Sequence, residues 1–155
     1  MTASLQAKVP AERPVHPLTI ALLADVTHAC EALGAQFVLA GASARDIQLW
    51  HIHGIKAPVA TRDVDIAVCA VSWDVHHQLA ETLLASGHFQ RDPKAQQKLV
   101  FRREGDEFGV ELDLVPFGPL EAPAGEIAWP PDGDTCHDGA GLPGGDRHRT
   151  ACGDR

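Results

Sequence analysis

The chain has 155 residues, with 45% hydrophobic and only 5% aromatic residues, which fits a single globular domain. A net charge of −8 argues against broad, nonspecific binding to DNA or RNA, although it is compatible with a nucleotide whose metal ion supplies positive charge. The sequence has no apolar run of about 18 residues and no apolar signal-peptide core near its start, so we expect a cytoplasmic protein with no membrane partner.

Residues 1–16 are expected to form a flexible leader, and a folded domain is expected over 17–131. Apolar residues at helical spacing predict helices over residues 18–33, 43–53 and 73–86. Short apolar or alternating runs predict strands over residues 36–40, 63–70, 98–103 and 110–115, the last two as a hairpin. This order predicts an α/β or α+β fold, a mixed sheet of about four to five strands with helices packed against it.

The composition changes abruptly at about residue 132. Residues 132–155 contain six of the 14 glycines, and Leu142 is their only large aliphatic residue. Such a segment buries too little apolar surface to fold, so we expect a disordered tail. The change also fits a frameshift in a GC-rich reading frame, a hypothesis that the coding DNA would test.

Two aspartates, Asp63 and Asp65, open the apolar strand DVDIAVCA. Side chains two residues apart on a strand share a face, with Cα atoms roughly 6.5 Å apart. Two carboxylates on one face repel each other unless a positive group lies between them, and Mg²⁺ prefers such oxygen ligands. The alternative is a solvated strand end with two surface aspartates.

Gly41-Ala42-Ser43 lies between a predicted strand and a predicted helix. Small residues at such a turn allow backbone N–H groups to approach a phosphate closely. Ser43 is either a phosphate donor or a helix N-cap. Arg45, near the start of the helix, is either a phosphate contact or a surface residue.

A third carboxylate, Asp113, lies in the middle of the strand VELDLV and shares a face with Glu111. An acidic residue in so apolar a strand is costly unless it is paired or bound to a metal. The alternative is an amphipathic strand with one wet, acidic face.

Together these elements resemble the nucleotidyltransferases of the DNA polymerase β type. Within them the chain is most similar to the AbiEii-like branch of toxin–antitoxin systems, through ATRDVDI and LDLVPF. The resemblance covers residues 37–117, about half of the chain.

The resemblance implies roles for the residues of the motifs. Gly41 and Ser43 would hold the nucleotide's β- and γ-phosphates, while Asp63, Asp65 and Asp113 would bind Mg²⁺, with Mn²⁺ as an alternative ion. Asp113 would also help to deprotonate the acceptor hydroxyl. The reaction would transfer a nucleoside monophosphate from an NTP to a hydroxyl of a tRNA, a protein or a small molecule, with release of pyrophosphate.

The sequence departs from the family pattern in three respects. Ala42 stands where relatives often carry Gly or Ser. Apolar residues precede Thr61 where many relatives carry a basic residue, so Lys56 or Arg62 is expected to supply that charge. Larger relatives continue into a C-terminal helical region, so the chain is expected to be truncated. The alternative function is therefore an inactive, nucleotidyltransferase-like binding module, with an antitoxin as its expected partner in a toxin–antitoxin system.

Trp50 and Trp73 are expected in the core rather than as platforms for base stacking. The histidine pairs His51-x-His53 and His76-His77 lack acidic or cysteine partners at a recognisable zinc spacing, so we do not expect them to bind a metal.

Overall fold

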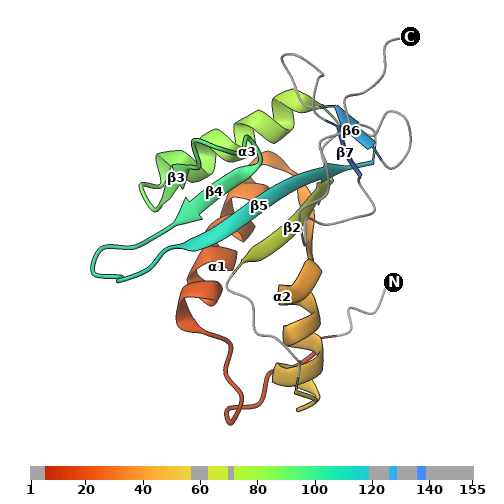
Figure 1. The fold of residues 1–155 in the computed structure, drawn as a ribbon, viewed down its shortest axis with the longest axis vertical. Helices are drawn as coiled ribbons and strands as arrows, with labels where there is room; N and C mark the ends of the chain where they lie inside the picture. Colours follow the sequence, from red (N-terminus) through yellow and green to blue (C-terminus); the bar gives the residue numbers. More distant parts are fainter. Residues whose placement is uncertain (1–5, 57–62, 70–71, 119–125, 129–135, 139–155) are drawn as a thin grey trace.

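A computed structural model of the chain describes residues 6–56, 63–69, 72–118, 126–128 and 136–138. Within these ranges the fold is α/β, with a five-stranded mixed sheet and helices packed against it (Figure 1). The helices are α1 Pro17–Leu33, α2 Gly41–Asp46 and α3 Trp73–Ala85, and the π-helix η1 Ile47–Ile52 directly continues α2. The strands are β1 Gln36–Ala40, β2 Val64–Cys69, β3 Phe89–Arg91, β4 Lys98–Phe101, β5 Val110–Phe117, β6 Glu126–Ala128 and β7 Cys136–Asp138. The predicted fold class is confirmed.

The order of strands in the main sheet is β1-β2-β5-β4-β3. The two central strands, β2 and β5, run parallel, and the remaining pairs are antiparallel. The predicted hairpin is therefore present as β4 and β5. A separate two-stranded sheet pairs β6 with β7.

The hydrophobic core lies between one face of the sheet and the helices α1 and α3. Alternating residues of β2, the two valines Val64 and Val68 with Ile66 between them, are at most 2% exposed. Leu22 of α1 and Leu79 of α3 are fully buried in the same cluster. Because successive strand residues point to opposite faces, this burial directs the residues between them to the other face of the sheet.

The ends of the long helices follow from local chemistry. The His16 side chain accepts a hydrogen bond from the Leu18 N–H at the start of α1, and Gly34 ends α1 in the left-handed region at φ 63°. The Ser72 hydroxyl caps α3, and Gly87, with φ 82°, follows its end. The predicted helix boundaries are confirmed within one residue at these sites.

Several features differ from expectation. The second helix begins at Gly41 rather than Ser43 and changes to π-helix after Asp46, a geometry that periodicity does not distinguish from an α-helix. The short strands β3, β6 and β7 were not predicted, because three residues carry too little pattern. Trp50 is 39% exposed, so its expected place in the core is wrong.

The described part of the leader contacts η1. The Arg13 guanidinium donates to the Ile52 carbonyl at 3.2 Å, and the His51 ring hydrogen-bonds the Arg13 carbonyl at 2.8 Å. Within the predicted tail, 132–155, the structure describes the strand β7, and the rest lies outside the described residues, so the proposed boundaries of leader and tail stay predictions. Among the described residues, no helix is both long and apolar enough to cross a membrane.

Candidate active site

The two central strands bring Asp65 and Asp113 together. The parallel register of β2 and β5 places Asp65 directly beside Asp113, close enough for the two carboxyl groups to share a hydrogen bond when one of them is protonated. Asp65 is 8% exposed and Asp113 is 4% exposed. The structure therefore holds two adjacent, buried carboxyl groups on the face of the sheet opposite the core.

Gly41 lies against this pair. Its φ of 62° is in the left-handed region, and a Cβ at this position would be 2.2 Å from Asp65 Oδ2. Any larger residue would therefore collide with the carboxyl group as well as strain the backbone. The β1–α2 turn and the aspartate of β2 form one site.

Ser43 connects this turn to the start of β2. Its hydroxyl donates a hydrogen bond to the Asp63 carbonyl, 20 residues further along the chain, and the side chain is buried. Ser43 is the third residue of α2, whereas Ala40 is the N-cap and makes no side-chain cap. The N-cap interpretation of Ser43 is therefore wrong.

A lysine lies on the other side of the pair. Lys98 on β4 is in register with Asp113, and its Nζ is 3.8 Å from Asp113 Oδ2. The same Nζ donates a hydrogen bond to Glu111 Oε2. This contact confirms that Glu111 and Asp113 share a face of β5, as predicted.

Burial dominates the electrostatics of the pair. Desolvation raises the pKa of Asp113 to about 6, against the opposing effect of Lys98 and with a further contribution from Asp65. Desolvation also raises the pKa of Asp65, partly offset by its hydrogen bond to Asp113. Protonation of one partner relieves the repulsion between two buried carboxylates, so the pair has an unusual affinity for positive charge.

The remaining predicted site residues are less closely associated with the pair. Asp63 precedes β2 and is exposed, yet it is near enough to influence both carboxyl groups electrostatically. Ala42 is half-buried in the first turn of α2. Arg45 forms an ion pair with its neighbour Asp46 at 3.0 Å.

Lys56 and Arg62 are the two candidate basic residues before β2. Lys56 is exposed, and Arg62 lies outside the described residues. The structure does not contain a group of three or more His, Cys, Asp and Glu side chains with metal-binding geometry among the residues it describes. Asp65 and Asp113 are thus a pair rather than a complete ligand set, and the assignment of Asp63 as a ligand stays a prediction.

Lys98 is the site residue that the sequence did not reveal. It opens the apolar strand KLVF, where a lysine is typical of a solvent-exposed strand end. Only the pairing of β4 with β5 places it opposite Asp113. The sequence indicated that Lys98 lies in a hairpin with β5, but it did not indicate which residue of β5 lies opposite it.

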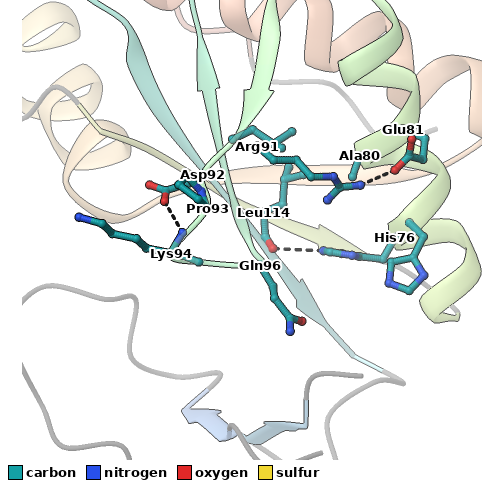
Figure 2. A pocket seen from close by; sticks show the side chains of 12 residues that line it. His76, Ala80, Glu81, Arg91, Asp92, Pro93, Lys94, Gln96 and Leu114 are labelled. Carbon is teal, nitrogen blue, oxygen red and sulfur yellow. Dashed lines mark hydrogen bonds and ion pairs between the residues drawn. The ribbon is translucent and has the colours of Figure 1, made fainter. Parts of the chain in front are cut away.

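A separate cavity of about 850 Å³ lies between α3 and the loop that joins β3 to β4 (Figure 2). Core-facing Leu99 and Leu114 line it, so it lies on the opposite side of the sheet from the carboxyl pair. The His76 Nε2 hydrogen-bonds the Leu114 carbonyl at 3.1 Å, and burial lowers the pKa of this histidine. An ion pair between Arg91 and Glu81 crosses the cavity.

Comparisons with protein-family models and with curated proteins gave no match. A solved structure of a CCA-adding enzyme with CTP is 20% identical with a TM-score of 0.44, covering 73% of this chain and 25% of that one. The apo form of a tRNA-processing enzyme is 20% identical with a TM-score of 0.37, covering 66% of this chain and 24% of that one. The chain spans about a quarter of the length of each. Both similarities are too low to indicate a function.

Proposed function

We propose that this chain is a Mg²⁺-dependent nucleotidyltransferase domain that transfers a nucleoside monophosphate from an NTP to a hydroxyl acceptor. The observation that supports this most is the contact of Asp65 with both Asp113 and Gly41. Three motifs that are far apart in the sequence thereby meet at one end of β2.

The residues present fit a divalent cation. Asp65 and Asp113 offer carboxylate oxygens, the ligands that Mg²⁺ and Mn²⁺ prefer, and exposed Asp63 at the same strand end would be a further ligand. Asp113 Oδ1 is buried and accepts no hydrogen bond from any described residue. A buried carboxylate oxygen of this kind is costly unless a cation or donor meets it. A bound ion would supply charge stabilisation for the phosphates.

The chain's own groups would bind and orient the nucleotide. The N–H groups at the start of α2, from Gly41 to Ser43, lack partners within the helix and are suited to phosphate oxygens. The Ser43 hydroxyl stabilises the site, because its hydrogen bond to the Asp63 carbonyl holds the β1–α2 turn against the start of β2. Arg45, Lys56 and Arg62 remain candidates for phosphate contacts.

The chemistry is a displacement at the α-phosphorus. The acceptor oxygen forms a bond to that phosphorus, the bond to the oxygen bridging the α- and β-phosphorus atoms breaks, and pyrophosphate leaves. The acceptor's proton passes to the carboxylate of Asp113. The acceptor class, whether tRNA, protein or small molecule, and an antitoxin partner are parts of this proposal that direct assays must identify.

Isothermal titration with ATP, GTP, CTP and UTP in the presence of Mg²⁺ tests the proposal. We expect at least one NTP to bind, and we expect Asp65→Asn with Asp113→Asn to abolish binding while the fold persists. A matched control is Glu104→Gln, an exposed carboxylate on the β4–β5 loop. A folded wild-type sample that binds none of the four nucleotides contradicts the proposal.

A non-catalytic binding module is the second candidate. It is favoured by the incomplete ligand set, since the described residues contain no group of three with metal-binding geometry. Incubation with radiolabelled NTP and a pool of tRNA, with the protein itself as an alternative acceptor, separates the two functions. Nucleotide binding without any pyrophosphate release would support the module, including a role as a toxin–antitoxin component.

A further inference from the structure

We propose that Lys98 is the built-in counter-ion of the Asp65–Asp113 pair and positions Asp113, balancing the pair's charge until a divalent cation takes over that role. The part of this inference that concerns a divalent cation rests on the proposed function, whereas the role of Lys98 as counter-ion does not.

The backbone fixes where the Lys98 side chain begins. Its N–H donates to the Ala95 carbonyl at 3.2 Å, and its carbonyl accepts from the Asp92 N–H at 3.1 Å. The register of β4 with β5 then places Lys98 beside Asp113. The position of this lysine is therefore set by the sheet and by the preceding loop, not by its flexible stem alone.

Two carboxylates hold the ammonium group between them. The Lys98 Nζ bonds to Glu111 and is 3.8 Å from Asp113 Oδ2, and its side chain is only 21% exposed. Glu111 thus acts as an anchor that keeps part of the positive charge away from the pair. The Lys98 side chain is thereby held beside the Asp65–Asp113 pair.

The order of strands places the residues of the site in a row with the lysine at one end. Gly41 follows β1, Asp65 is on β2, Asp113 on β5 and Lys98 on β4, and these strands are neighbours in that order. Among the described residues, the cation that acts electrostatically on both carboxyl groups is Lys98, on the β4 side of the row. Removing it leaves two buried carboxyl groups facing each other without compensation, which is destabilising.

This geometry has a consequence that a purely structural lysine would lack. The ammonium and a divalent cation are attracted by the same negative charge and repel each other. Loss of Lys98 should therefore destabilise the metal-free protein and, at the same time, strengthen cation binding. A lysine that only supports packing would weaken both when it is removed.

The test measures Mn²⁺ binding by calorimetry and thermal stability in chelator for Lys98→Met and Lys98→Arg. We expect Lys98→Met to lower the Mn²⁺ dissociation constant about fivefold, the order of magnitude for removing one repelling unit charge from the neighbourhood of the cation. Its melting temperature without metal should fall. Lys98→Arg keeps the charge and should stay within about twofold of wild type for Mn²⁺.

Glu111→Gln provides a second test, for which the expected change in Mn²⁺ affinity is the opposite. This test is independent of whether Lys98→Met folds. Without its anchor, the ammonium shifts its full charge toward Asp113, so Mn²⁺ should bind more weakly than in wild type. Unchanged or weaker Mn²⁺ binding by folded Lys98→Met, or unchanged binding by Glu111→Gln, overturns the inference.

The counter-ion role of Lys98 can be tested even if the proposed function is wrong. If wild type binds no Mn²⁺, a double-mutant cycle of Lys98→Met with Asp113→Asn in chelator still tests the counter-ion. We expect Lys98→Met to lower the melting temperature clearly less in the Asp113→Asn background than in wild type. An equal loss in both backgrounds would show that Lys98 does not balance this carboxyl group.

Discussion

Replacing Asp113 with asparagine should stabilise the metal-free protein near neutral pH. Asp113 is 4% exposed and lies beside Asp65, and desolvation raises its pKa to about 6. In the unfolded chain an aspartate has a pKa near 3.9, so the folded state binds this proton more tightly. The stabilising effect is fully present below the unfolded pKa and is lost as the pH rises through about 6. The asparagine amide keeps a donor for Asp65 at every pH, as the protonated acid does.

The size of the effect follows from the difference between the two pKa values. A difference of about two units corresponds to on the order of 3 kcal/mol between pH 4 and pH 8. Relative to wild type, Asp113→Asn should therefore gain up to about 3 kcal/mol of unfolding free energy at pH 8. It should gain much less at pH 4, where wild type is already protonated.

The assay is urea denaturation in chelator at pH values from 4 to 8, with Glu104→Gln as the control for loss of an exposed carboxylate. The difference between variant and wild type is the informative quantity, because other groups also titrate. Burial lowers the pKa of His76, so His76 contributes stability above its unfolded pKa of about 6.5 and loses it as the pH falls. A difference that stays constant, or that shrinks as the pH rises, would refute the reasoning about Asp113.

Three further variants test the packing around the site. In thermal denaturation, Gly41→Ala should lower the free energy of unfolding by more than about 1 kcal/mol, and it should abolish Mn²⁺ binding, because the added Cβ would lie 2.2 Å from Asp65 Oδ2. The control is Gly34→Ala, which has a similar φ but open space around the added Cβ. It should lower the free energy of unfolding less and leave Mn²⁺ binding intact. Ser43→Ala should lose about 1 kcal/mol by urea denaturation, through the missing bond to the backbone before β2, and a neutral result would mean that this bond is dispensable. Ile66→Ala should lose about 3 kcal/mol in the same assay, since the side chain is 0% exposed, and a loss under 1 kcal/mol would contradict its place in the core.

Much of the fold could be predicted because the relevant signals are local. Apolar spacing located α1 and α3, and the glycine that follows α1, Gly34, adopts the left-handed region that glycine enters without strain. The strands β1, β2, β4 and β5 were evident from short apolar runs. The edge strand β3 was missed, since its pairing with β4 rather than its own three residues defines it.

The sequence by itself determined which residue types were available at the site: a small turn at Gly41, two aspartates at the start of β2 and one in the middle of β5. It could not determine that Asp65 and Asp113 are neighbours, or that Lys98 lies beside them. Those facts depend on which strands pair and in what register, and a shift of one residue would have turned each side chain to the other face. The long-range packing of Val64, Ile66 and Leu112 fixes that register, so the tertiary structure alone decided that the carboxyl groups meet beside Gly41 and become difficult to ionise.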